Sequence, residues 1–488
     1  MTMAMFHRAE MLLRLGYDCS ILTLDYNPGF DDQVETIYAS GRLSRSVAIL
    51  NPFKQLSELA VQRKPVRAQL NDAGTQGRYV EVGEAEGGRY ERHFSADGMY
   101  LHYVRKRRDG TIQFVDHFDE HHVRTRRDEF APLGWIHKST DYNMGKVHQE
   151  RFFAPNGDAY LSRWWNVDTG KPSIVFDLSS THGVAHRYSS LSAWQTAWMA
   201  SIAGEASSTI VCDGPGSMLK VIDVPSHIAR RVGVVHTAHF EYSPDSDRGP
   251  LKQNHSFLER AHELDALVVP TEEQARDIVD EFGAADRVVT IRNVLPTGAA
   301  ARPRVTVTSR VSMFCTLNAG KQVDHAIRAF GKIASEFPDA AFDIFGEGPE
   351  KQRLQALINE LGLHERIRLR GYTLDVEGEM RASTCTLLTS RQEGMSYVIA
   401  ESMLQQVPCV SYDARYGPSE LITDGSNGLL VAEGDVTGLA GALGSMLRDP
   451  RRAREMGERA RLAVLRLFDA DQIEDAWRSL VEGELSEG

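Results

Sequence analysis

The chain has 488 residues, of which 42% are hydrophobic and 25% are charged, as in an ordinary globular protein. This length predicts two or three domains. The net charge of −12 argues against a nucleic-acid-binding protein, whose surface would be basic. No apolar run has membrane-spanning length, and the first residues do not show the charged n-region and apolar h-region that are typical of a signal peptide. The five cysteines are scattered and form no CxxC pair, which favours buried, reduced thiols over disulfides or zinc.

Residues 1–64 open with a helical pattern that runs from Met5 to Leu13 and ends at Gly16. A strand over residues 19–24 follows. An α/β domain normally places a strand and a glycine-containing turn before its first helix, and both are missing here. The sequence therefore predicts the first part of an N-terminal Rossmann-like lobe without its first strand, and a start codon further upstream would explain the gap.

Residues 65–170 show a different sequence pattern from the preceding segment. Short runs rich in aromatic and β-branched residues, such as MYLHYVRKR and TIQFVDHF, lie between turn signals. This pattern predicts antiparallel hairpins, and hence a β-rich insertion. By analogy alone, acceptor binding or oligomerisation is expected of it. The turn signals are Asp97-Gly98, Asp109-Gly110 and Asn156-Gly157.

A cluster of acidic and histidine residues in the insertion raises the question of a metal site. Alternate side chains of a strand point to opposite faces, so these residues do not converge simply. A polar sheet face is the preferred interpretation, and no metal is expected. The cluster consists of Asp116, His117, Asp119, His121 and His122.

From residue 171 onward, apolar strands alternate with helices. Residues 171–304 are predicted to form the second part of the N-terminal lobe, with PSIVFDLSS, STIVCDG and RVGVVHTAHF as strands. Residues 305–468 are predicted to form a second α/β lobe, and residues 469–488 a C-terminal helix. Strands alternating with helices indicate parallel sheets, with ligands at the carboxyl ends of the strands.

Glu393 and Glu401 stand eight positions apart, between an apolar strand and a helix. Gly394 follows the first glutamate. A strand, a glycine turn and a helix start bring free backbone N–H groups to one point, which suits phosphate. Carboxylates beside phosphate suit hydroxyl groups joined to it, as in a nucleotide sugar. Spacing alone leaves an acidic loop with a helix-face glutamate equally open.

The surrounding motifs make the pattern more specific. Residues 310–440 contain AGKQVDHAIRAF, FGEGPEKQRLQALI, LRGYT, EGMSYVIAESMLQQVPCVSYDARYGPSELI and DGSNGLLV. This stretch resembles the nucleotide-binding lobe of family 4 retaining glycosyltransferases, which have the GT-B fold. The β-rich insertion, with HTAHF, GPLK and YDARYGP, resembles the poly(glycerol- or ribitol-phosphate) α-glycosyltransferases of wall teichoic acid. The glycosyltransferases of serine-rich surface adhesins share this layout.

The resemblance assigns roles to individual residues. Glu393 matches the carboxylate that faces the donor sugar, and Glu401 matches the one that binds ribose hydroxyls. Lys321 matches the cation that neutralises the donor phosphates, and His236 matches a histidine that touches the donor sugar from the other lobe. The amides of Gly394, Met395 and Ser396 would receive the diphosphate, and the backbone of Arg370, Gly371 and Tyr372 would meet the base.

One position departs from the family pattern. Members usually carry an arginine five residues before the lysine, and here that position is Thr316. A hydroxyl cannot replace a permanently charged guanidinium. Arg310 and Arg391 are the arginines that we considered as substitutes.

The resemblance implies a cytoplasmic enzyme, at the inner face of the membrane, that needs no cofactor or metal. It would move glucose or N-acetylglucosamine from a UDP-sugar to a polyol-phosphate polymer or a surface glycoprotein, with retention of configuration. The alternative is a silent glycosyltransferase-like subunit that binds acceptor or stabilises an active partner. Oligomerisation through the insertion is a further expectation.

Overall fold

The computed structural model describes residues 3–62, 79–166, 168–180, 184–204, 208–243, 249–295 and 309–484. These residues divide into two compact units. Unit 1 comprises residues 1–17, 207–222 and 229–488, and unit 2 comprises residues 18–206 and 223–228.

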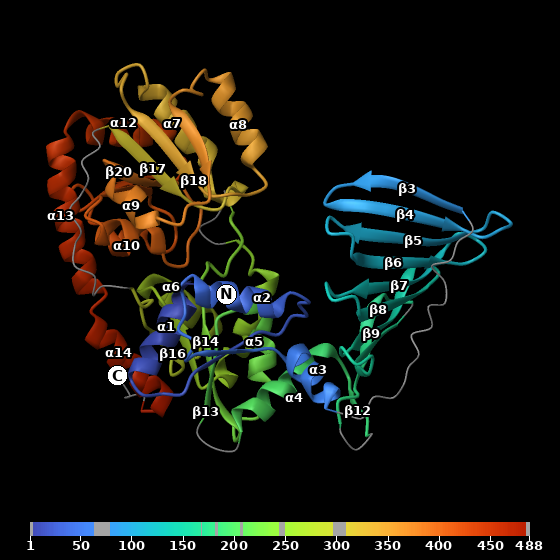
Figure 1. The fold of residues 1–488 in the computed structure, drawn as a ribbon. Helices are drawn as coiled ribbons and strands as arrows, with labels where there is room; N and C mark the ends of the chain where they lie inside the picture. The colour runs from blue at the N-terminus through green and yellow to red at the C-terminus, as the bar shows by residue number, and fades with distance from the viewer. Residues whose placement is uncertain are drawn as a thin grey trace. The chain divides into compact units, whose positions relative to one another are not determined.

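Unit 2 is built on a ten-stranded antiparallel sheet whose strands β3 to β12 follow one another in chain order (Figure 1). Gly98, Gly110 and Gly157 sit at its turns with φ of +87°, +86° and +87°, a conformation that glycine adopts without strain. The predicted hairpins are therefore confirmed. The strands are β3 (Tyr79–Ala85), β4 (Gly88–Phe94), β5 (Tyr100–Arg107), β6 (Ile112–Phe118), β7 (Arg124–Phe130), β8 (Ile136–Asn143), β9 (Lys146–Phe153), β10 (Ala159–Asn166), β11 (Lys171–Asp177) and β12 (His186–Tyr188).

The sheet continues past residue 170, where the sequence predicted a return to α/β structure. The strand within PSIVFDLSS is β11, and it pairs antiparallel with β10 in a register that places Leu161 opposite Asp177. Val175 of β11 is fully buried in the core that also contains Trp194. The expected place of this strand in a parallel sheet was therefore wrong, because an apolar run looks the same in a parallel strand and in an antiparallel strand that packs against helices.

The rest of unit 2 packs around this core. Asn51 caps α3 by accepting hydrogen bonds from the N–H groups of Phe53 and Lys54. The ring of Phe53 in α3 contacts the rings of Phe152 in β9 and Trp194 in α4. The elements are β1 (Ser20–Leu22) and β2 (Ala48–Leu50), which form a parallel pair, and α2 (Phe30–Ala39), α3 (Pro52–Val61) and α4 (Leu191–Ala203).

Unit 1 contains two parallel sheets. The first has four strands in the order β13-β14-β15-β16, and it confirms STIVCDG and RVGVVHTAHF as strands of a parallel sheet. Its elements are α1 (Met3–Arg14), β13 (Ser208–Cys212), α5 (Pro215–Ile222), β14 (Ala229–Val234), the 3-10 segment η1 (Gln253–Glu263), β15 (Ala266–Val269), α6 (Glu272–Phe282) and β16 (Val288–Thr290).

The second sheet has six parallel strands in the order β19-β18-β17-β20-β21-β22. Helix α7 covers it with an apolar stripe at helical spacing, in which Val323, Ile327 and Phe330 are buried. The elements are β17 (Arg310–Phe314), η2 (Ala319–Lys321), α7 (Val323–Ile333), β18 (Ala341–Phe345), α8 (Lys351–Glu360), β19 (Ile367–Gly371), α9 (Val376–Arg381), β20 (Cys385–Leu388), α10 (Tyr397–Leu404), β21 (Cys409–Tyr412), α11 (Pro418–Leu421), β22 (Leu429–Val431), α12 (Val436–Arg448), α13 (Pro450–Leu467) and α14 (Ala470–Glu482).

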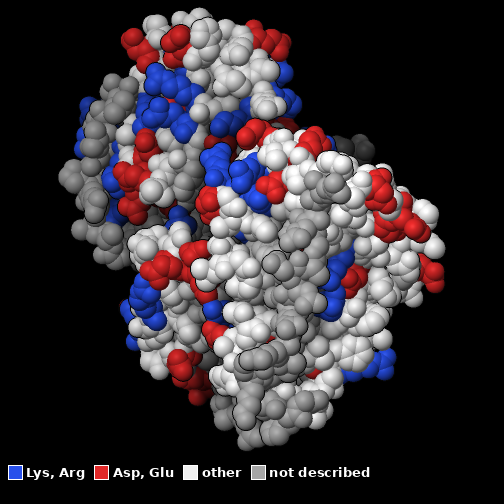
Figure 2. Space-filling view, turned by 45° about the vertical axis from the view of Figure 1, so that its right-hand side comes forward, with Lys and Arg blue, Asp and Glu red and all other residues white. Residues whose placement is uncertain are grey.

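The surface charge is mixed. On the face drawn in Figure 2, Lys and Arg side chains are interspersed with Asp and Glu, and no continuous basic surface is visible in that view. Within the described ranges, no helix is both long and apolar enough to cross a bilayer.

Candidate active site

The six-stranded sheet has a topological switch point between β17 and β20. Strands added after β17 run outward to one side (β18, β19), and strands from β20 onward run to the other side (β21, β22). Ligands of open parallel sheets bind at such a point, outside the carboxyl ends of the strands. Lys321 follows β17 and Glu393 follows β20, so both predicted residues lie at this edge.

The structure brings Lys321 and Glu393 into direct contact. The Lys321 Nζ lies 2.7 Å from the Glu393 Oε1, with side chains that are 27% and 13% exposed. Hydrogen bonds join the two loops behind this pair. The Arg391 N–H donates to the Gly320 carbonyl at 3.0 Å, and the Thr389 hydroxyl donates to the Lys321 carbonyl at 2.8 Å. The cation and the carboxylate are thus fixed together.

The start of α10 offers unused donors beside this pair. Among the described residues, the backbone N–H groups of Gly394, Met395 and Ser396 donate no hydrogen bond. The Ser396 hydroxyl is buried and also lacks a protein partner in the described part of the chain. Unpaired buried donors are rare, and a phosphate group would satisfy them. The structure therefore fits the diphosphate site predicted from the sequence.

Glu401 lies one turn before the end of α10, and its carboxylate has no hydrogen-bond or ion-pair partner within the described ranges. Burial, reinforced by the nearby charge of Glu377, raises the pKa of its carboxyl to about 7. Hydroxyl groups that donate to the carboxylate would favour its ionised form. The hydroxyl groups of a ribose could do this, in line with the predicted role.

His236 follows β14 of the first sheet and contacts the Glu393 loop through its backbone. A Cβ atom placed on Gly394 would lie 2.0 Å from the His236 carbonyl oxygen, so glycine is required at this position. The His236 Nε2 lies 2.6 Å from Asp213 Oδ1, and Arg8 bonds the other oxygen of Asp213. The histidine predicted from the resemblance therefore lies against the loop of the predicted carboxylate.

The two arginines considered as substitutes at Thr316 lie at opposite ends of the strands. Arg310 begins β17, at the amino end, where Asp343 and Glu379 hold its guanidinium at 2.7 and 2.6 Å. The suggestion of Arg310 was therefore wrong. Arg391 follows β20 at the carboxyl end, and its guanidinium lies 4.9 Å from the centre of the Tyr242 ring. The side chain of Thr316 is exposed after β17.

Arg370, Gly371 and Tyr372 end β19, two strands away from β17. The carbonyl of Gly371 accepts a hydrogen bond of 2.8 Å from the N–H of Gly346. The φ of Gly371 is +72°, a conformation that favours glycine. The ring of Tyr372 is 68% exposed. Their predicted contact with the base remains a prediction.

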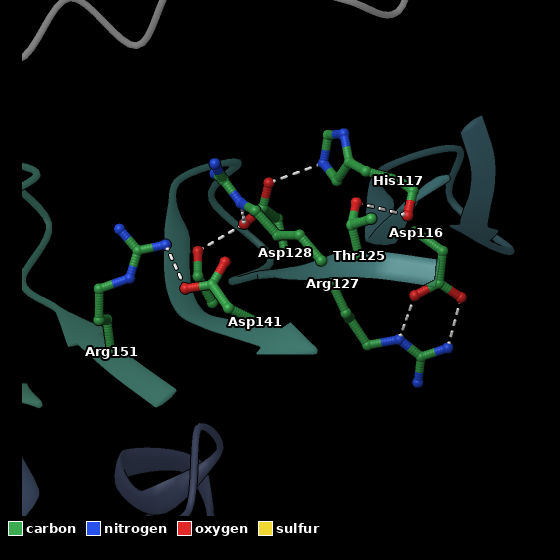
Figure 3. A network of polar contacts seen from close by, with 9 residues as sticks. Asp116, His117, Thr125, Arg127, Asp128, Asp141 and Arg151 are labelled. Carbon is green, nitrogen blue, oxygen red and sulfur yellow. Dashed lines mark hydrogen bonds and ion pairs between the residues drawn. The ribbon is translucent and has the colours of Figure 1, made fainter. Parts of the chain in front are cut away.

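Two members of the acidic and histidine cluster, Asp116 and His117, belong to a network of ion pairs and hydrogen bonds in the insertion (Figure 3). Arg127 donates to both oxygens of Asp116, through its Nε at 2.7 Å and one terminal nitrogen at 2.6 Å. Asp128 accepts hydrogen bonds from His117 at 2.9 Å and Arg126 at 2.7 Å. No group of three or more His, Cys, Asp or Glu side chains suited to a metal occurs in the described ranges.

Sequence reasoning missed Asp213 and Arg8. Asp213 had a usable signal, because it is a polar residue directly after an apolar strand, in VCDG. Arg8 had none, because its neighbour lies 205 positions away in the chain. Pairing over such a distance is set by the tertiary fold.

Comparisons with known proteins agree with the predicted glycosyltransferase resemblance. Residues 311–463 match the family model of glycosyl transferases group 1. A poly(ribitol-phosphate) α-N-acetylglucosaminyltransferase of Staphylococcus aureus is 24% identical over 98% of this chain and 96% of its own length. The GtfA subunit of a UDP-N-acetylglucosamine–peptide N-acetylglucosaminyltransferase of Streptococcus gordonii is 24% identical over 72% of this chain and 69% of its own.

The solved structures show the same fold. A variant of S. aureus TarM, crystallised with fondaparinux, α-GlcNAc-glycerol and UDP, superposes with a TM-score of 0.88 at 23% identity, over 98% of this chain and 96% of that one. The predicted resemblance, the GT-B fold and the glycosyltransferase class are confirmed. The roles of individual residues and the domain limits stay predictions.

Proposed function

We propose that this GT-B glycosyltransferase moves N-acetylglucosamine from its UDP-sugar to a polyol-phosphate polymer, with retention of the anomeric configuration. The observation that carries the proposal is the Lys321–Glu393 pair, 2.7 Å apart, beside three backbone amides at the start of α10 that donate no hydrogen bond within the described ranges. A relative that covers nearly the whole chain is named for this sugar and a ribitol-phosphate acceptor. Glucose remains the alternative donor sugar.

The described residues supply the charge that such a transfer needs. As the glycosidic bond breaks, negative charge grows on the departing diphosphate, and a fixed cation such as Lys321 stabilises that state more than the ground state. The amides of Gly394, Met395 and Ser396, with the dipole of α10 behind them, act in the same direction. Because this charge is built into the protein, we expect the enzyme to need no metal ion.

Glu393 and His236 are expected to face the donor sugar, and Glu401 to hold the ribose. The acceptor hydroxyl would attack the face that the diphosphate leaves, and the leaving phosphate would take its proton. All five cysteines are free thiols, which suits a reducing compartment. We therefore place the enzyme in the cytoplasm, at the inner face of the membrane where a polymer acceptor is built.

The test combines purified protein, UDP-N-acetylglucosamine and either poly(ribitol phosphate) or poly(glycerol phosphate). We expect release of UDP and an α-anomeric signal on the polymer in the proton NMR spectrum. UDP-glucose and a serine-rich peptide serve as the competing donor and acceptor. Binding of UDP-sugar without any transfer would support the silent-subunit alternative, and absence of both binding and transfer would refute the proposal.

A further inference from the structure

Behind His236 lies a chain of charged hydrogen bonds. Asp213 directly follows β13 and His236 comes shortly after β14, and these neighbouring parallel strands pair Cys212 with Gly233. Both side chains therefore lie at the same edge of the sheet. The Asp213 carboxylate shares its two oxygens between His236, at 2.6 Å, and Arg8 of α1. The side chains of Arg8, Asp213 and His236 are only 7%, 12% and 16% exposed.

The ionisation of Asp213 decides where the proton of this contact sits. Burial by itself would raise the pKa of Asp213, but the Arg8 guanidinium and the hydrogen bond to His236 lower it to about 2. A carboxylate ionised throughout the working pH range only accepts hydrogen bonds. The proton therefore lies on Nε2 of His236. Nδ1 is then the remaining nitrogen, and it has no protein partner in the described part of the chain.

We propose that Asp213, held by Arg8, is a positioning residue that fixes the ring orientation and the Nε2–H tautomer of His236, so that Nδ1 is the nitrogen offered to the donor sugar. The main chain holds His236 from the other side, where its carbonyl abuts Gly394. The effect of this positioning on catalysis rests on the proposed function, in which His236 touches the donor. The tautomer itself does not depend on that function.

A purely structural role is the competing explanation. The Arg8 guanidinium also lies 4.8 Å from the centre of the buried Trp477 ring, so the Arg8–Asp213 pair helps to hold α1 against α14. Loss of stability in a variant would therefore fit both explanations. The tautomer of His236 and the separation of kcat from KM distinguish them.

The decisive variant is Asp213→Asn, which keeps the shape but offers an amide in place of the carboxylate. We expect kcat to fall about 10- to 100-fold, as when other orienting partners are lost. KM for the UDP-sugar should stay within about twofold, because Asp213 does not touch the phosphates. Asp265→Asn is the matched control, since Asp265 pairs with Arg231 at 3.1 Å in the same sheet, and it should leave kcat unchanged.

The second readout is the imidazole nitrogen spectrum of ¹⁵N-histidine protein. The chain has 17 histidines, so the His236 signals are found by difference from His236→Gln. We expect the Nε2–H tautomer in the wild type and its loss in Asp213→Asn but not in Asp265→Asn. An Nδ1–H tautomer in the wild type, or an unchanged kcat in folded Asp213→Asn, would overturn the proposal. Because this measurement needs no turnover, inactivity on every sugar nucleotide would refute the proposed function and still leave the tautomer measurable.

Discussion

Two charged clusters of this protein look alike in sequence and differ in how completely their groups are paired. In the insertion, the carboxylates of Asp116 and Asp128 are saturated by arginine, histidine and serine donors. Beside the switch point of the six-stranded sheet, the Glu401 carboxylate, the Ser396 hydroxyl and three amides lack protein partners among the described residues.

This difference separates structural charge from functional charge. A saturated network stabilises the fold and has no capacity left for a ligand. Groups that stay unsatisfied in a buried place cost stability, so their persistence indicates a partner that is bound during function. Lys321 and Glu393 are paired with each other, but both side chains remain partly exposed and can still contact a ligand.

The largest effect is expected at Lys321. Lys321→Ala removes the fixed cation from the leaving diphosphate, and we expect kcat for sugar transfer to fall about 10²- to 10³-fold. Lys351→Ala is the matched control, because Lys351 is an exposed lysine paired with Glu347 at 2.8 Å in the same lobe, and it should keep full activity. Equal activity of the two variants would remove Lys321 from the mechanism.

The next effect concerns the contact between Gly394 and His236. In Gly394→Ala the new Cβ would lie 2.0 Å from the His236 carbonyl oxygen, so one of the loops must shift. We expect kcat to fall about 100-fold, because misplacement by about 1 Å has that consequence. Gly441→Ala, in the middle of α12 with open space around it, should leave activity intact and stabilise the fold by about 0.5–1 kcal/mol in urea unfolding.

A smaller effect is expected at Thr316, where the family pattern has an arginine as the second cation beside Lys321. Thr316→Arg restores the charge that relatives carry, and because the side chain is exposed, the variant should fold normally. We expect a gain in kcat/KM of about three- to tenfold, the equivalent of about 1 kcal/mol. Arg391→Ala measured in parallel tells whether Arg391 already supplies part of that charge. If it does, Arg391→Ala lowers kcat/KM and the gain in Thr316→Arg is small.

The raised pKa of the Glu401 carboxyl predicts that UDP binding depends on pH. Its pKa of about 7 means that the carboxyl is largely protonated below pH 7 and ionised above it. Because ribose hydroxyls favour the ionised form, UDP should bind about threefold or more tightly at pH 8 than at pH 6. Glu401→Gln corrects for the ionisation of UDP itself. Titration calorimetry that finds the same pH dependence in both proteins would contradict this assignment.

The raised pKa of Glu401 also has a consequence for folding. Its folded-state pKa lies above the ordinary value of a glutamate, so its stabilising effect is complete at low pH. That contribution is lost as the pH rises through the window from about 4.5 to about 7, and it amounts to at most about 3 kcal/mol. In urea unfolding, the wild type should therefore lose stability relative to Glu401→Gln across this window.

The smallest effect on activity is expected in the insertion. Asp128→Asn breaks a buried network and should lower the free energy of unfolding by about 3 kcal/mol. Sugar transfer to a short acceptor below the melting temperature should not change, because Asp128 belongs to the saturated cluster. A loss of transfer in folded Asp128→Asn would show that the two clusters are less distinct than their pairing suggests.

Much of the candidate site could be predicted from local sequence patterns. Glu393 and Gly394 were placed correctly between a strand and a helix start, and Glu401 within that helix, because a strand followed by a glycine turn and a helix has one common geometry. Lys321 came from the motif that surrounds it. The strand of PSIVFDLSS was placed in the wrong sheet, since burial under α3 and α4 gives an antiparallel strand the apolar run of a parallel one.

By itself, the sequence determined the alternation of strands and helices, the hairpins of the insertion and the acidic motif, because these depend on neighbours within a few residues. Only the tertiary structure decided that Asp213 and Arg8 stand behind His236, and that Arg310 lies at the far end of β17. Those contacts join residues far apart in the chain, and their geometry follows from strand order and register. No local spacing encodes that order.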